Sequence, residues 1–305
     1  MKRKVIQIAG STQLVSLPRD WSIQHNVQKG DELEVEAQGN RVVVSIDKAV
    51  EKFKRAEIDV TELVPIVQRV LGAFYKKGYD EIVVKFASPE VLNSVQHLLQ
   101  NEIIGYEIVD QKPDHCTIRA IARGAETEFD PILRRTFLLL KAFLEGIVEA
   151  LDAGDASRIS VLRAMESSNN KYSSFCRRLI NKMGRDEHWK TSLAYAIVEE
   201  LEKIADEAKY LCDYLLESKK NINKANKQIK ELYREVSGLF EGCYTLYYSP
   251  DVKKTAVYLA KRKKIIKSAL QFLAKPCSQS RFAHYIMTMS QQIANVINLE
   301  MELTL

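Results

Sequence analysis

The chain lacks most of the features that mark secreted, membrane and redox proteins. Its five cysteines are widely spread and include no Cys-x-x-Cys pair, a pattern typical of reduced thiols in a cytosolic protein. No apolar run approaches the ~18 residues that a membrane span needs. The start, Met1-Lys2-Arg3-Lys4, is basic, but no apolar segment follows it as in a signal peptide. We therefore expect a cytoplasmic protein without membrane insertion.

Catalytic motifs are also missing. The five histidines have no neighbours that suggest a catalytic triad. No glycine-rich phosphate loop and no dinucleotide fingerprint occurs. We therefore expect that the protein is not an enzyme. Its net charge of +5 is mild and permits a polyanionic partner without requiring one.

The most informative pattern lies at residues 4–46. Two short β-prone runs flank the turn residues Gly10-Ser11-Thr12, and Pro18 suits the start of a short helix over 19–25. Hydrophobic and polar residues then alternate on both sides of Gln38-Gly39-Asn40, which predicts a hairpin. A unit of about 45 residues buries too little apolar surface to be stable alone. We expect a second copy of the chain to complete it.

This N-terminal pattern resembles the SpoVT/AbrB family of DNA-binding domains, with markers such as Val15-Ser16-Leu17-Pro18-Arg19, Trp21 and Gly30-Asp31. The resemblance implies a dimeric β-barrel of swapped hairpins over 1–48 that binds double-stranded DNA. The family's contacts fall on basic and small polar residues of the first strands and the following turn. In this sequence those positions are Arg3, Lys4, Gln7, Ser11, Thr12 and Arg19. A dimerisation cap with ordinary surface lysines is the alternative.

Residues 49–125 predict a small α/β linker module. The segment 47–70 is charged and helical in pattern. A strand at 81–86 and a helix from Ser88 to about Gln100 follow, since serine and proline favour a helix start. Two further strands are expected at 106–110 and 115–121.

Residues 126–305 are helical in pattern throughout, because apolar residues recur at steps of three and four and turn-forming residues separate the segments. The expected helices span 130–152, 156–183, 187–217, 222–248, 251–274 and 279–303. They predict two three-helix bundles, 130–217 and 222–303. A short internal repeat, in which residues 201–206 align with 290–295, supports this division. The fold class is therefore α+β multidomain.

The helical part resembles the PhoU family of phosphate-uptake regulators, on Leu201-Glu202-Lys203-Ile204-Ala205-Asp206 and on the stretch from Met165 to Arg178. The resemblance implies that Glu166, Glu202 and Asp206 hold one divalent or iron-type metal ion in the first bundle. Asn170 stands where the family has an aspartate. Gln291 and Asn295 replace both acids in the second bundle, so no second site is expected. A solvated acidic face is the alternative.

Two basic runs, Lys253-Lys254 and Lys261-Arg262-Lys263-Lys264, suggest a further use of the helical part. Four consecutive cations repel one another, which makes contact with an acidic partner plausible. A solvated helix face explains them as well.

Together these observations predict a transcriptional regulator of phosphate uptake or phosphate-responsive genes that forms a homodimer or a higher homo-oligomer. Its helices would sense or relay a signal. The alternative is a PhoU-like adaptor that contacts a phosphate transporter or signalling protein and uses its N-terminal domain only to dimerise. An antitoxin is disfavoured, because antitoxins usually follow the DNA-binding unit with a short, disordered tail.

Overall fold

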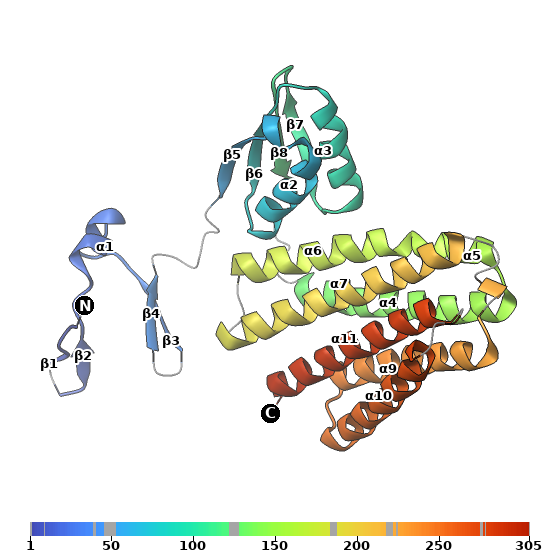
Figure 1. The fold of residues 1–305 in the computed structure, drawn as a ribbon. Coiled ribbons are helices and arrows are strands. Elements are labelled where there is room, and N and C mark those ends of the chain that lie inside the picture. The colour runs from blue at the N-terminus through green and yellow to red at the C-terminus, as the bar shows by residue number, and fades with distance from the viewer. Residues whose placement is uncertain are drawn as a thin grey trace. The chain divides into compact units, whose positions relative to one another are not determined.

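The computed structural model describes residues 2–8, 10–38, 41–45, 53–121, 128–183, 188–217, 222–223, 225–274, 277 and 279–304. Backbone contacts divide the chain into two compact units, Met1–Lys52 and Phe53–Leu305. The first consists of small strands and one short helix. The second has an α/β part followed by a largely helical part, so the fold is mixed α+β (Figure 1).

The first unit contains two separate hairpins and one helix. Strand β1 (Ile6–Ile8) pairs with β2 (Thr12–Leu14), and Gly10 provides the positive φ of 79° that their turn requires. Helix α1 (Arg19–Gln24) follows Pro18, as predicted. Strands β3 (Glu34–Gln38) and β4 (Arg41–Ser45) form the predicted second hairpin. Its predicted turn residues Gly39-Asn40, and Ile46 beyond it, lie outside the described residues.

Neither hairpin of the first unit has a hydrophobic core beneath it. Among its described residues no side chain is buried. Large apolar side chains are instead exposed at nine positions: Val5, Ile6, Ile8, Leu14, Val15, Ile23, Val35, Val42 and Val43. The two hairpins also belong to separate two-stranded sheets. The described part of one chain therefore forms no closed barrel, and the predicted barrel would need further strands.

The second unit begins with a four-stranded sheet in the order β5-β6-β8-β7. Strand β5 runs parallel to β6, and the remaining pairs are antiparallel. Two helices and a 3₁₀ turn accompany it. The elements are β5 (Arg55–Asp59), η1 (Thr61–Ile66), α2 (Val67–Lys76), β6 (Glu81–Lys85), α3 (Glu90–Asn101), β7 (Tyr106–Gln111) and β8 (His115–Ala120).

The predictions for strands β6, β7 and β8 and for helix α3 are confirmed to within two residues at each end. The helical pattern over 47–70 is wrong at 55–59, which form β5. Exposed and half-buried side chains alternate along this strand. That two-residue period suits an edge strand, and pairing with β6 satisfies its backbone. The charged residues of the segment concealed this alternation.

Seven helices follow in the described residues, close to the predicted bounds. They are α4 (Phe129–Ala153), α5 (Ala156–Arg163), α6 (Met165–Met183), α7 (His188–Glu217), α9 (Lys227–Tyr248), α10 (Val252–Leu273) and α11 (Ser280–Thr304). The predicted helix 156–183 is divided at Ala164, which ends α5. Gly154 stops α4 with a φ of 66°, and Asp155 caps α5. The predicted breakers at 184–186 and 275–276 lie outside the described residues.

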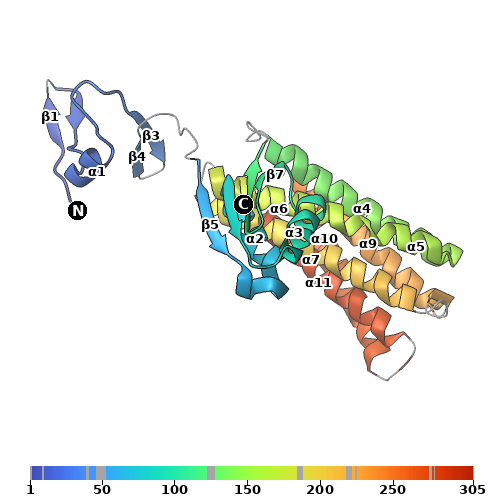
Figure 2. The same cartoon turned by 90° about the horizontal axis from the view of Figure 1, so that it is seen from above.

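One hydrophobic core runs through both halves of the helical part. Helix α7 packs against α11, and α4 packs against α9 (Figure 1). The same cluster of buried residues includes Leu140, Leu201, Phe240, Ile265 and Ile293, from five different helices. The α/β part contacts this body through α2 and α3, which lie on α6 (Figure 2). Within the described segments, no helix has the length and hydropathy of a membrane span.

Candidate nucleic-acid interface and charged networks

The six residues expected to contact DNA are all exposed in the first unit. Arg3 and Lys4 lie on the segment that leads into β1. Gln7, Ser11 and Thr12 lie on the β1–β2 hairpin, and Arg19 is the first residue of α1. In the described part of the chain, Arg3, Lys4 and Arg19 form no ion pair. Their charges are therefore available to neutralise phosphates.

The register of the first hairpin separates its two faces. Gln7 is opposite Gln13, and Ile8 is opposite Thr12. Directly opposed side chains of an antiparallel pair share a face, and successive ones alternate. Gln7 and Gln13 therefore lie on one face, while Thr12 shares the other with apolar residues of β1. The structure thus separates two of the predicted contacts and adds Gln13, whose alternation with Thr12 was visible in the sequence.

The residues expected to bind a metal ion lie in a network of ion pairs. Lys209 of α7 donates to Glu166 of α6 at 2.8 Å and to Asp206 at 2.7 Å. Asn170 also donates to Glu166, at 2.7 Å. Burial opposes the charge of Lys209, but its hydrogen bonds to Asp206 and Glu166 outweigh this and raise the pKa of its ammonium group. Glu166 and Asp206 are thus brought together around a cation that the chain itself supplies.

Glu202, the third expected ligand, points to a different cation. It pairs with Arg177 of α6, which also pairs with Glu199. Only 4% of the Arg177 side chain is exposed. In the part of the chain that the structure describes, no group of three or more His, Cys, Asp or Glu side chains is arranged to hold a metal ion. These contacts fit an ion-pair network better than a metal centre, and the metal ion stays a prediction.

The amides of the second half form links of another kind. Gln291 donates to Asn295 at 3.4 Å, and Asn295 donates to Glu200 of α7 at 2.9 Å. Asn295 thus ties α11 to the Glu200 carboxylate of α7, and Gln291 bonds to Asn295 within α11.

A buried cation joins the α/β part to the helices. Arg178 of α6 pairs with Asp80 at 2.6 Å and lies over the rings of Tyr75 and Tyr106, at 5.3 and 5.0 Å from their centres. Lys182 adds a second ion pair to Asp80, at 2.9 Å. Sequence reasoning missed this cluster, because its partners lie about 100 positions apart and form no local motif.

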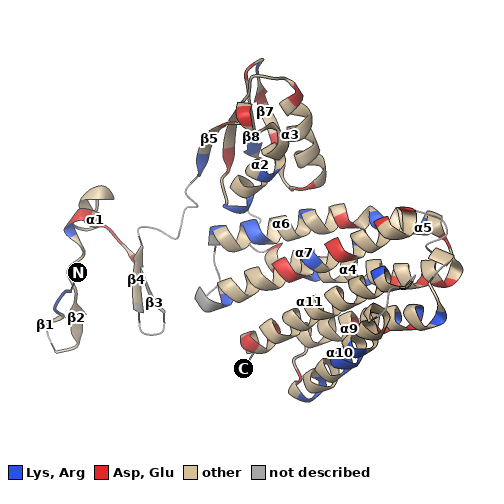
Figure 3. Ribbon diagram, in the orientation of Figure 1, with Lys and Arg blue, Asp and Glu red and all other residues tan. Residues whose placement is uncertain are grey.

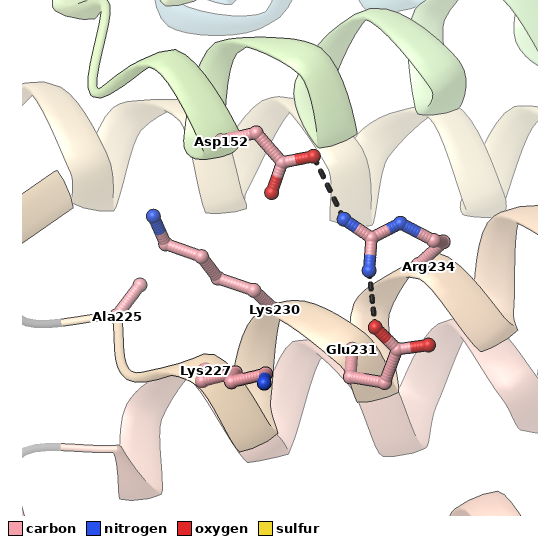
Figure 4. A pocket seen from close by; sticks show the side chains of 6 residues that line it. All are labelled: Asp152, Ala225, Lys227, Lys230, Glu231 and Arg234. Atoms are coloured by element: carbon pink, nitrogen blue, oxygen red, sulfur yellow. Dashed lines mark hydrogen bonds and ion pairs between the residues drawn. The ribbon is translucent and has the colours of Figure 1, made fainter.

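A pocket of about 360 Å³ lies where α4 ends and α9 begins (Figure 4). Its lining residues are Asp152, Ala225, Lys227, Lys230, Glu231 and Arg234. Arg234 bridges Asp152 and Glu231 across it, and Lys230 donates to the carbonyl of Leu151. Because most of these charges are already engaged, the pocket suggests no particular ligand.

Comparisons with known proteins concern the first unit. No curated protein and no solved structure shows a significant match to the chain. Residues 6–50 match the family model described as antidote-toxin recognition MazE, bacterial antitoxin. The matched range contains both hairpins and α1. The N-terminal unit is therefore similar to MazE/AbrB-type antitoxin domains.

Proposed function

We propose that the protein is a homodimeric DNA-binding regulator that grips duplex DNA through its N-terminal unit. This proposal is supported by the surface of the small N-terminal unit, which exposes both apolar side chains and basic side chains. It exposes large apolar side chains at nine positions, and it exposes cations, among them Arg3, Lys4 and Arg19, that form no ion pair within the described residues. A second copy would cover the first set, and DNA phosphates would neutralise the second.

The apolar side chains support dimerisation. Soluble monomers rarely expose apolar residues so densely, and about 45 residues cannot bury an adequate core alone. The apolar face of the β1–β2 hairpin carries Ile6, Ile8 and Leu14, all at least 45% exposed. Packing this face against a partner would leave the face of Gln7 and Gln13 outward. A dimer would then present two equivalent readers to a palindromic or repeated target.

The outward face has the chemistry of a reader. Arginine and lysine neutralise phosphates, and the hydroxyl of Ser11 in the turn can fix the position of the protein on the backbone. Thr12 lies on the face that the partner would cover. A glutamine amide both donates and accepts, and it can pair with the edge of adenine. Arg3, Lys4 and Arg19 would supply affinity, whereas Gln7 and Gln13 would supply sequence preference.

The helical part would sense or relay a signal to this reader. Support for phosphate as the signal comes from the PhoU-like stretches at 165–178 and 201–206. Six long helices around one core give such a domain a stable frame. The regulated genes would then be those of phosphate uptake. An adaptor that contacts a phosphate transporter or signalling protein would use the same helices and leave the basic residues without DNA.

An antitoxin-type regulator is the second candidate, because the matched family is described as a bacterial antitoxin. Such a protein would bind DNA through the same unit and hold a toxin through its C-terminal part. The packed core of 53–304 argues against a short disordered tail for that purpose. Copurification of a small partner encoded beside the gene would favour this candidate over a signal relay.

The test uses the full chain and DNA fragments selected from genomic DNA. We expect a particle of twice the 34.8 kDa of one chain by light scattering. We also expect a variant with Arg3→Ala, Lys4→Ala and Arg19→Ala to bind selected fragments more weakly and with a salt slope lower by about 0.9 for each lost phosphate contact. The control replaces three exposed lysines of the second unit, Lys77, Lys112 and Lys203, by alanine. A monomer, or a triple variant that binds like the control, overturns the proposal.

A further inference from the structure

The positive charge of this chain is concentrated in the second half of its helices. Residues 218–305 contain fifteen Lys and Arg against six Asp and Glu, whereas 129–217 contain thirteen against fifteen. The imbalance is greatest over 252–299, where nine Lys and Arg occur without a single acid. Helix α10 carries most of these cations (Figure 3).

Helix α10 directs its lysines away from the core. Thr255, Ile265 and Ala269 are its buried residues and define the inner side. The exposed side carries four lysines, Lys253, Lys263, Lys264 and Lys267, and the small residues Ala256 and Ala260. It also carries exposed apolar side chains, Val257 within the face and Val252 and Leu270 at its ends. Lys253, Lys264 and Lys267 lie on one stripe along the helix together with Val257 and Ala260, because these positions recur at steps of three and four, and Lys263 lies beside that stripe. We call the four lysines the α10 lysine face.

These lysines have no counter-charge in the described structure. None of the four pairs with a carboxylate there, although cations on other helices do, such as Lys141, Arg158 and Arg163. Among the described residues, this helix forms one ion pair, which links Lys254 to Asp251 at 3.7 Å near the first turn. Like charges on one helix face destabilise the helix slightly. The α10 lysine face therefore lowers the stability of the helix slightly, and no carboxylate in the described part of the chain compensates for this repulsion.

We propose that the α10 lysine face binds the phosphate backbone of duplex DNA as a second contact, independent of sequence. Its chemistry matches phosphates because its lysines are flexible point charges that can reach past the short side chains between them. It has the length for this: fourteen residues separate Lys253 from Lys267, which is ~21 Å of helix. A duplex carries one charge per ~1.7 Å, or about twelve over that span.

Two other acidic partners fit this face less well. Protein interfaces are enriched in aromatic residues and arginine and depleted in lysine, whereas lysine dominates this face. A membrane-surface helix inserts an apolar side between lipids. Most of the apolar side of α10 is occupied by the bundle core, to which Ile265 and Ala269 belong. The exposed Val252, Val257 and Leu270 are spread along the helix and form no continuous apolar side. Attraction to an acidic protein or to anionic lipid is therefore an outcome for the test to detect.

This second contact extends the proposed function but does not depend on it. It involves residues of the second unit only, and it would bind DNA of any sequence. In a regulator it would extend the occupied DNA beyond the segment read by the N-terminal unit. It would also make total affinity depend more steeply on salt, since each neutralised phosphate releases counterions.

The test compares two full-length variants on a 40-base-pair duplex of random sequence. One variant replaces the α10 lysine face (Lys253→Gln, Lys263→Gln, Lys264→Gln, Lys267→Gln). Its control removes the same charge from exposed positions elsewhere (Lys54→Gln, Lys77→Gln, Lys112→Gln, Lys203→Gln). Affinity is measured by fluorescence anisotropy between 50 and 200 mM salt. We expect the first variant to lower the salt slope by about three or more, at about 0.9 per phosphate, and the control to change it by less than one.

Further arms separate this proposal from the first one and from other polyanions. Both variants are repeated with Arg3→Ala, Lys4→Ala and Arg19→Ala in place, where the α10 face should supply most of the remaining binding. A loss seen only for the N-terminal triple variant supports the proposed function and overturns this one. Equal binding by the α10 variant and its control also overturns it. The proposal is also overturned if the α10 variant loses binding to phosphatidylserine vesicles or to polyglutamate but not to DNA. Circular dichroism confirms that each variant is folded.

Discussion

The two halves of the helical part contain similar helices, but their charged side chains are arranged differently. In α7 the residues Glu202 and Asp206 face inward cations, Arg177 and Lys209, which belong to the same body. In α11 the repeat-related Gln291 and Asn295 are neutral and bond to each other. The cations of the second half lie instead on the outer side of α10. Both halves contain paired charges, such as those of Arg234 and Arg281 in the second half. The α10 lysine face differs because it presents its charges to solvent.

This contrast predicts which charged residues affect stability and which affect binding. Paired, buried charges fix how helices and the α/β part meet, since an unpaired charge in the interior is costly. Unpaired, exposed charges contribute little to stability and are free to act on a partner. We therefore expect mutations in the first set to change unfolding and mutations in the second to change binding. Three experiments test this division.

The largest effect is expected at Asp80, which holds Arg178 and Lys182. Its side chain is 10% exposed and that of Arg178 only 6%. Asp80→Asn would leave the buried Arg178 without its carboxylate and would remove one partner of Lys182. It should lower the free energy of unfolding by about 3–5 kcal/mol. Urea unfolding at pH 7 measures the loss. Asp110→Asn is the matched control, because Asp110 is exposed and its ion pair with Lys112 is 4.0 Å long.

The pH dependence of this effect has a definite sign. Burial disfavours the charged form of Asp80, but hydrogen bonds from the Lys54 amide and from Lys182 outweigh burial and lower its pKa. A lowered pKa contributes stability above the ordinary value near ~4, and that stability is lost as pH falls through the folded-state value. The difference between wild type and Asp80→Asn should therefore shrink below pH 4. A difference that grows toward acid pH would contradict the ion pair.

Replacing Lys209 tests whether its ammonium group takes the place of a metal ion between Glu166 and Asp206. Lys209→Ala removes the cation between Glu166 and Asp206 and leaves two neighbouring carboxylates. We expect a loss of about 1–2 kcal/mol, because a partly buried charge pair is broken. Added Mn²⁺ should restore part of the melting temperature in the variant and leave wild type unchanged, since an ion stabilises only a state that binds it.

Two controls sharpen this experiment. Lys203→Ala removes a lysine of the same helix whose side chain is exposed and bonds to Glu200. It should lose little stability and gain nothing from Mn²⁺. If Mn²⁺ stabilises wild type as strongly as the Lys209 variant, Lys209 does not take the place of a metal ion. The prediction that Glu166, Glu202 and Asp206 bind an ion would then stand.

The sequence predicted features that depend on neighbouring residues. The hairpin at β3 and β4, helix α1 and most helix bounds follow from alternation, turn residues and caps that act within a few positions. The errors arose where local signals conflicted. Charged residues concealed the strand at 55–59, and nothing in the helical period marked the break at Ala164.

For the candidate sites too, residues could be predicted from local sequence, whereas contacts between distant residues could not. Arg3, Lys4 and Arg19 could be chosen from their type and position, but the opposed pair of Gln7 and Gln13 needed the register of β1 and β2. Lys209 lies three residues after Asp206, on the same side of α7, and that signal was available but unused. The link from Arg178 to Asp80 crosses about 100 residues, so only the folded chain reveals it.

The smallest effect on stability is expected from the cations of the second half. Replacing Lys263 and Lys264 by glutamine removes two exposed charges that pair with no carboxylate among the described residues. Surface substitutions of this kind change stability by about 0.5 kcal/mol or less, and relief of repulsion with Lys267 favours a slight gain. Urea unfolding of the double variant measures this, with Lys77 and Lys112 replaced as control. A loss above about 1 kcal/mol would place these lysines with the paired, structural charges, and the contrast between the two halves would then fail.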